Sequence, residues 1–332
     1  MRKMGGKYKR SFGKEEADQR RLLFQEAKKL QKEARDWEQY LIDRIIDESA
    51  VVAATLIGSN HHYIQDKQWD VIVIDEAGQA LGPATWVAIC HAEKVVLAGD
   101  PHQLPPTVKS NKAAELGLGK TLLDVAIEQL PNAVSFLNVQ YRMHQDIMAF
   151  SNAQFYKEAL VAHESVASRG WSSEESAVLF IDTAGCGFEE QPGVDGDSLQ
   201  NPEEWQIIQK HIEAKQMHLA GDIAVISPYR AQVSWVQNDM SDAHRWTVNT
   251  IDSFQGQEED VVYISLVRSN EQSEIGFLKD YRRMNVAMTR ARKGLVSVGD
   301  SATLAKDSFY SKMIEMIATK GGYISAWEML YS

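Results

Sequence analysis

The residues with the clearest chemical potential are two neighbouring carboxylates, Asp75 and Glu76. They follow the β-branched run Val71–Ile74, which is typical of a buried strand in a parallel sheet. Ligands of open parallel sheets bind beyond the carboxyl ends of the strands, where this pair would lie. A carboxylate in that position can bind Mg2+, and its neighbour can orient a water molecule for attack on a phosphate group. The alternative is structural, since carboxylates at strand ends often cap the following helix.

A second polar segment, Gly99–Thr107, follows the next apolar run, Lys94–Ala98. It contains Gln103, whose amide can hydrogen-bond a γ-phosphate without adding charge, and two prolines that stiffen the loop. The segment begins about 25 residues after the acidic pair. This spacing strengthens the phosphate interpretation of both features.

The elements that must position these residues alternate between strand and helix signals from residue 50 onward. The strand signals are short, mostly β-branched runs at residues 51–55, 71–74, 94–98, 178–181, 223–226, 261–267 and 295–298. Helix-length segments separate them. One opens at Asn201, which can cap, with Pro202 at the first helical position and Glu204 placed to close a capping box. Apolar strands that alternate with helices predict an α/β fold whose parallel sheets are covered on both faces.

A long N-terminal helix and a break near Leu130–Asn132 divide the chain. Residues from about 15 to 48 carry apolar side chains at 4-3-4-3-4-4 spacing, a seam along one helix face formed by Leu23, Ala27, Leu30, Ala34, Trp37, Leu41 and Ile45. Such a seam needs a partner helix, from the globular body or from outside this chain. We therefore expect a helical segment at 1–49, part of one α/β domain at 50–130 and a complete second one at 131–332.

The composition is that of an ordinary globular protein, and it narrows the choice of partners. A net charge of −11 argues against a protein that coats nucleic acid over its whole surface, but it permits a local groove for a strand. No apolar run approaches the roughly 20 residues of a membrane span, and no signal peptide opens the sequence. Cys90 and Cys186 cannot form a disulfide framework or a zinc site alone. We expect a cytoplasmic protein with reduced thiols and no membrane partner.

Six motifs then occur in an order that resembles a known family. They are Asp75–Gly78, Gly99–Pro106, Val139–His144 (Val-Gln-Tyr-Arg-Met-His), Ser227–Gln232 (Ser-Pro-Tyr-Arg-Ala-Gln), Thr250–Glu258 (Thr-Ile-Asp-Ser-Phe-Gln-Gly-Gln-Glu) and Arg283–Arg292 (Arg-Met-Asn-Val-Ala-Met-Thr-Arg-Ala-Arg). Together they resemble the superfamily 1B helicases of the nonsense-decay and immunoglobulin-mu-binding-protein type. The likeness to the latter is the closer one, since it extends to Asp182–Phe188 and to the helix before Val51. The resemblance covers nearly the whole chain and implies two RecA-like domains, the first only in part.

The resemblance also implies roles for individual residues in the hydrolysis of ATP with Mg2+. Asp75 would bind Mg2+ and the nucleotide, Glu76 would act as the base, and Gln103 would contact the γ-phosphate. Arg142 and Arg290 would be arginine fingers that reach a cleft between two RecA-like domains. Guanidinium groups can stabilise transition-state charge there, although salt bridges remain an alternative role for both.

Further residues are implied in coupling and in strand binding. Gly256 and Glu258 would lie near the nucleotide and couple it to the strand, whereas Arg292 is expected to be structural. Four residues would face a nucleic-acid groove, with capping or core packing as their alternatives: Thr55, Thr107, Tyr229 and Thr250. The implied activity is that of a 5′→3′ helicase, a monomeric motor on single-stranded DNA or RNA. A non-catalytic nucleic-acid-binding or regulatory module, derived from such a helicase, is the alternative.

One part of such a motor is missing from the sequence. A phosphate cradle of the form Gly-x-x-x-x-Gly-Lys-Ser/Thr should precede the acidic strand, and nothing before residue 70 supplies it. The segment Ala114–Thr121 resembles a cradle, but it follows the acidic strand and no strand leads into it. We therefore expect the chain to be the C-terminal half of the helicase, beginning midway through the first motor domain.

We predict that the 332-residue chain alone hydrolyses ATP poorly or not at all, because it has no phosphate cradle. Steady-state ATP hydrolysis with and without single-stranded DNA or RNA measures this. Robust turnover that nucleic acid stimulates would refute the prediction.

Overall fold

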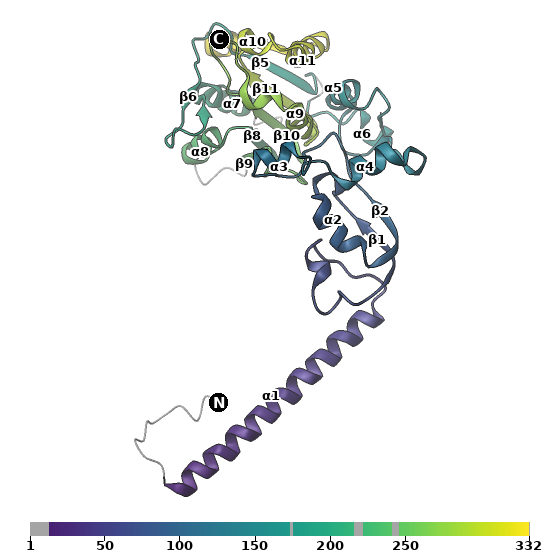
Figure 1. Ribbon diagram of the computed structural model, residues 1–332. Coiled ribbons are helices and arrows are strands. Elements are labelled where there is room, and N and C mark those ends of the chain that lie inside the picture. Colours follow the sequence, from purple (N-terminus) through teal and green to yellow (C-terminus); the bar gives the residue numbers. More distant parts are fainter. Residues whose placement is uncertain (1–12, 173–174, 216–221, 241–245, 332) are drawn as a thin grey trace. The chain divides into compact units, whose positions relative to one another are not determined.

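The computed structural model describes residues 13–172, 175–215, 222–240 and 246–331 (Figure 1). The chain divides into two compact units. The first is Met1–Ala98 with Ser110–Leu122, and the second is Gly99–Lys109 with Leu123–Ser332. Residues 1–12 of the expected N-terminal helical segment lie outside the described residues.

Helix α1, Lys14–Glu48, confirms the expected long N-terminal helix. It ends at Ser49, whose backbone N–H donates to the carbonyl of Ile46. Its apolar seam is open to solvent, because no residue of α1 is buried and Trp37 is 66% exposed. The described part of the chain therefore supplies no partner that covers the seam.

The sheet of the first unit has two parallel strands, β1 (Trp69–Ile74) and β2 (Ala92–Leu97), connected through helix α2 (Gly82–Ile89). The expectation that the strand before the acidic pair is wholly buried is wrong. Ile74 is 4% exposed, but Val73 is 65% exposed. Successive side chains of a strand point to opposite faces, and within the first unit only one face of this sheet is covered.

Three short elements accompany this sheet: η2 (Gly58–Asn60), η3 (Ala77–Gln79) and α3 (Asn111–Glu115). The strand expected at residues 51–55 does not form, and Val51 is exposed. A β-branched run becomes a strand only where a neighbouring strand accepts its hydrogen bonds, and the described residues offer none to this segment.

The second unit is built on a six-stranded, all-parallel sheet with the strand order β12-β5-β11-β10-β8-β9. The strands are β5 (Val178–Asp182), β8 (Ile223–Ser227), β9 (Trp246–Thr250), β10 (Glu259–Ser265), β11 (Ala291–Gly299) and β12 (Tyr323–Ser325). Four of them match the runs expected to be strands, while β9 and β12 lie outside those runs. The arrangement confirms the predicted α/β class with a RecA-like parallel sheet.

Helices cover both faces of this sheet, as its continuous apolar strands predict (Figure 1). On one face, Phe180, Ile226 and Ile264 share a core with residues of α5 (Gln145–Phe155), α9 (Tyr281–Met288) and α11 (Ser308–Thr319). On the other face, Ile181 and Tyr263 share a second core with residues of α7 (Pro202–Lys215) and α8 (Arg230–Asp239). No helix of the described residues is both long and apolar enough to cross a membrane.

The remaining elements of the second unit are short. They are α4 (Leu122–Gln129), η4 (Pro131–Ala133), β3 (Val139–Gln140), β4 (Val161–Ala162), α6 (Glu164–Ala167), β6 (Gln191–Pro192), β7 (Leu199–Gln200), η5 (Gly276–Lys279), α10 (Ser301–Leu304) and α12 (Ala326–Tyr331). The first residue of α4, Leu122, belongs to the first unit.

The N-terminus of α7 forms as predicted, with one difference. Asn201 Oδ1 accepts the Glu204 N–H at 3.2 Å, and Pro202 opens the helix. The Glu204 carboxylate, however, closes no capping box. It is fully buried, where it accepts the Ser265 hydroxyl at 2.6 Å and the Val267 N–H at 2.9 Å. Val267 has a φ of +70°, rare for a β-branched residue, so Glu204 supports a strained turn after β10.

Burial raises the pKa of Glu204 to about 8, although its hydrogen bonds act in the opposite direction. We predict that this group makes the stability of the chain fall as the pH rises from about 5 to about 8. In this window the folded chain holds a proton on Glu204 that the unfolded chain has already lost. The Glu204→Gln variant resembles the protonated acid and should remove this part of the pH dependence. Urea denaturation across the window measures it, and an unchanged slope of stability against pH would contradict the prediction.

Candidate functional site

Asp75 and Glu76 lie at the end of β1, and both are exposed. Glu76 has a φ of +51°, a left-handed conformation that is uncommon for a residue other than glycine. Its carboxylate accepts the side-chain N–H of Gln79 at 2.8 Å, and its backbone N–H donates to Asp75 Oδ1 at 3.0 Å. Glu76 precedes η3 without making a side-chain capping bond. The pair therefore does not serve as a helix cap, and Gln79 orients one of its carboxylates.

This strand end suits a magnesium ion that is shared with a phosphate ligand. Mg2+ is commonly bound by one or two carboxylates together with water and substrate phosphates. Among the described residues, no group of three or more His, Cys, Asp or Glu side chains could hold a metal ion. An exposed Asp75 beside Glu76 fits the first kind of site and not a closed protein cage.

Gln103 belongs to the second unit, in the loop Gly99–Lys109. Its side-chain amide donates to Asp100 Oδ2 at 3.1 Å, and Asp100 Oδ1 accepts the His102 N–H at 2.9 Å. Leu104, the next residue, is buried in the core of that unit. The loop thus presents a half-buried glutamine on an anchored turn.

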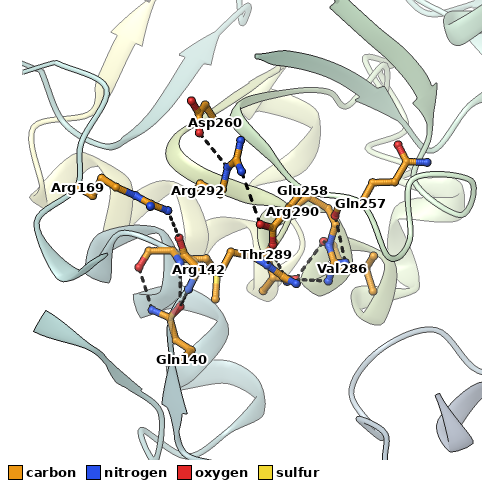
Figure 2. Close-up of polar contacts among 11 residues, drawn as sticks. Gln140, Arg142, Arg169, Gln257, Glu258, Asp260, Val286, Thr289, Arg290 and Arg292 are labelled. Atoms are coloured by element: carbon orange, nitrogen blue, oxygen red, sulfur yellow. Dashed lines mark hydrogen bonds and ion pairs between the residues drawn. The ribbon is translucent and has the colours of Figure 1, made fainter. Parts of the chain in front are cut away.

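Arg142 and Glu258 form an ion pair in the second unit (Figure 2). Arg142 Nη1 also donates to the Thr289 carbonyl at 3.2 Å. The backbone of Arg142 is held on both sides, because Gln140 Oε1 accepts its N–H at 2.8 Å and Arg169 donates to its carbonyl at 2.9 Å. The Arg142 side chain is nevertheless 35% exposed, so a fixed backbone carries a guanidinium that solvent can reach.

Arg290 lies in the same cluster but is buried, with an exposed fraction of 3% (Figure 2). Three of its hydrogen bonds go to uncharged oxygens: the Val286 carbonyl at 3.0 Å, the Thr289 hydroxyl at 3.2 Å and the Gln257 carbonyl at 3.4 Å. The salt-bridge alternative therefore describes Arg142, whereas these bonds fix Arg290 to the end of α9 and to the turn before β10.

Gly256 and Glu258 lie in that turn and complete the cluster. Gly256 has a φ of +79°, which favours glycine. Glu258 pairs with Arg142 and, at 3.7 Å, with Arg292, which itself pairs with Asp260 at 2.9 Å. The structure thus brings four predicted residues together from three distant segments, and it gives Arg292 the structural contacts expected of it.

Three residues that hold the arginines were missed by sequence reasoning: Gln140, Arg169 and Thr289. Gln140 and Thr289 lie inside the motifs that contain Arg142 and Arg290, so motif membership was the available signal. Arg169 lies outside every motif, and only the fold brings it to Arg142.

The residues expected to face nucleic acid are placed in different ways. Thr55 and Thr250 cap local turns, each accepting the N–H three residues on, at 2.9 Å and 3.3 Å. Tyr229 needs a correction, because its side chain is 2% exposed within the second unit and offers no ring face to a strand. Thr107 is exposed. Of the four, Thr107 has the setting that best suits strand contact.

Known proteins match the chain over the same motifs. A family model described as an AAA domain matches residues 118–302, more than half of the chain, and a second model with the same description matches residues 3–111. DNA-binding protein SMUBP-2 of Mesocricetus auratus is 38% identical over 98% of this chain and 34% of its own length. The chain belongs to the superfamily 1B helicases. Asp75 and Glu76 lie within the second match, and Arg142 and Arg290 within the first.

Other relatives of this helicase chain carry helicase names. DNA polymerase alpha-associated DNA helicase A of Saccharomyces cerevisiae is 39% identical over 87% of this chain and 48% of its own length. The chain spans less than half the length of these curated relatives. A solved Arterivirus nonstructural protein 10 helicase in complex with DNA matches at a TM-score of 0.36 and 18% identity, over 71% of this chain and 41% of that chain. The family assignment rests on the sequence matches.

We predict that the two arginines differ sharply in their effect on stability. Arg290→Ala should destabilise the chain by about 2–4 kcal/mol, because it leaves buried carbonyl oxygens without donors. Arg142→Ala removes a half-exposed ion pair and should cost less than about 1 kcal/mol. Urea unfolding measures both, with Arg282→Ala on the exposed side of α9 as the control. Equal losses for Arg290→Ala and Arg142→Ala would contradict the assigned burial.

Proposed function

We propose that this chain works in an ATP-dependent helicase that moves 5′→3′ along single-stranded DNA or RNA, to which it contributes the acidic strand end and the arginine cluster. The meeting of Arg142, Glu258 and Arg290, from segments far apart in the sequence, carries this proposal. A cluster of guanidinium groups with one exchangeable carboxylate suits a phosphate ligand. The helicase names of the relatives support the same reading.

At the acidic strand end, Asp75 would hold Mg2+, which neutralises phosphate charge when it is bound. Glu76 would orient the attacking water and accept its proton. The N–H of Gln79 already engages one Glu76 oxygen, which fixes the plane of the carboxylate and leaves the other oxygen for water. Gln103 would exchange its Asp100 partner for a γ-phosphate oxygen, a swap between two negatively charged acceptors that leaves its amide satisfied.

The arginines would act in two different ways. Arg290 is fixed by backbone acceptors, so its position is set before any ligand arrives. Arg142 is exchangeable, because its carboxylate partner is itself 39% exposed on the side chain. A phosphate oxygen would compete with Glu258 for this guanidinium, and a released Glu258 would retain Arg292. This competition gives the β10 turn a direct response to the presence of ATP.

Strand binding would rest on backbone phosphates and would tolerate many sequences, as is usual for motors on single strands. An overall charge of −11 makes a small basic or hydroxyl-lined surface more plausible than a broad one. The proposal includes a monomeric motor in the cytoplasm.

The decisive test is ATP hydrolysis, measured on this chain and on the longest open reading frame that contains it, with single-stranded DNA or RNA. In whichever form hydrolyses ATP, Glu76→Gln should lower kcat by about 10²–10⁴, the usual contribution of a general base. Arg142→Ala should lower kcat by about 10³–10⁵, as for an arginine finger. Glu93→Gln, an exposed glutamate on β2, is the matched control and should keep full activity.

The outcomes separate the motor from its rival. Hydrolysis that survives in Glu76→Gln or Arg142→Ala would overturn the assigned roles. Binding of a labelled strand without hydrolysis in either form would favour the non-catalytic module, for which the exposed acidic pair has no use.

A further inference from the structure

The loop that carries Gln103 is attached to the second unit by polar contacts that the proposed chemistry does not use. Asp100 Oδ2 accepts the Tyr156 hydroxyl at 2.6 Å as well as the Gln103 amide. Tyr156 OH in turn accepts Asn285 Nδ2 at 3.0 Å, and the same Nδ2 donates to the His102 carbonyl at 2.9 Å. Two side chains from α9 and the end of α5 thus grip both ends of one tight turn.

These gripping groups are shielded from water. Asn285 is fully buried, and the ring of Tyr156 lies edge-on to that of His102, with centroids 5.2 Å apart. Burial and the neighbouring Asp100 carboxylate both raise the pKa of Tyr156, which therefore stays protonated and donates. A hydrogen bond from a buried hydroxyl to a carboxylate is among the stronger uncharged-to-charged contacts in proteins.

The same network continues to the arginines. The Asn285 carbonyl accepts the Thr289 hydroxyl at 2.8 Å, and the Thr289 carbonyl accepts Arg142 Nη1 at 3.2 Å. Arg290 follows directly and is bonded back to Val286, the neighbour of Asn285. An unbroken series of short contacts therefore joins Gln103 to both arginines within the second unit.

We propose that Tyr156 and Asn285 are positioning residues that fasten the Gln103 turn to α9, so that this glutamine and the two arginines form one rigid set. The proposal rests on the proposed function for the roles of Gln103 and the arginines, but the fastening itself is a property of the second unit. Neither residue contacts the reacting atoms. Each acts through Asp100 or through the backbone of the turn.

The fastening predicts a local effect of removing one oxygen atom. In Tyr156→Phe the ring packing stays while the bond to Asp100 is lost. Hydrogen–deuterium exchange of the full chain should then accelerate about tenfold in residues 99–109, the size expected for losing one hydrogen bond to a charged group. Exchange in β5, β10 and β11 should not change. Asn285→Ala should accelerate the same segment.

A matched control is available on the same helix. Tyr281, the first residue of α9, donates to Asp307 at 2.8 Å, so Tyr281→Phe removes a tyrosine-to-aspartate bond of the same kind without touching the turn. Exchange in residues 99–109 should be unchanged in this variant. Equal acceleration in Tyr281→Phe, acceleration across the whole sheet, or no acceleration in Tyr156→Phe would each overturn the proposal.

A kinetic measurement links the fastening to the proposed function. In a form of the protein that hydrolyses ATP, Tyr156→Phe should lower kcat about tenfold with little change in KM, because the turn is misplaced only where the transition state needs it. Tyr281→Phe should leave both constants unchanged. If no form hydrolyses ATP, the proposed function fails, whereas the exchange experiment still decides whether the turn is fastened. A normal kcat in Tyr156→Phe together with accelerated exchange would overturn its role as a positioning residue.

Discussion

The pairing of the first residues of β10 and β11 sets where the charged groups of the second unit lie. Glu259 pairs with Ala291, and the Glu259 N–H donates to the Arg290 carbonyl at 3.0 Å. Since the strands are parallel, the residues that precede them, Glu258 and Arg290, are placed at the same edge of the sheet. Helices on both faces protect this register, because a slip of one residue would turn each apolar side chain towards the wrong layer. Burial of apolar surface thus places a polar site.

The charged residues of that edge divide into fixed and exchangeable groups. A buried guanidinium or carboxylate is costly unless its hydrogen bonds are made, and Arg290 and Glu204 each have several partners in the interior. Arg142 and Glu258 are both partly solvated, so their ion pair is weak and can be replaced by a ligand. This contrast, set by depth and not by residue type, distinguishes groups that shape the site from groups that can respond to phosphate.

Much of this architecture could be predicted from the sequence where a pattern is local. Continuous apolar runs gave β5, β8, β10 and β11, and the spacing of the seam gave α1. The errors arise where a local pattern meets an absent or unexpected neighbour. Val73 is apolar but exposed because one face of its two-stranded sheet is uncovered. Glu204 is placed for a capping box, yet its carboxylate is drawn into the interior by Ser265 and by the strained backbone at Val267.

The sequence by itself determined the fold class, the long helix and the identity of the residues able to handle phosphate, because strand and helix preferences and motif spacings act over a few neighbouring residues. Only the tertiary structure decided their partners: Glu258 for Arg142, a buried setting for Arg290 and Tyr229, and the grip of Tyr156 and Asn285 on the Gln103 turn. These contacts join residues as far as 183 positions apart. Such choices depend on how two layers of helices close over one sheet, since the same polar side chain can satisfy its hydrogen bonds in several places and packing selects one.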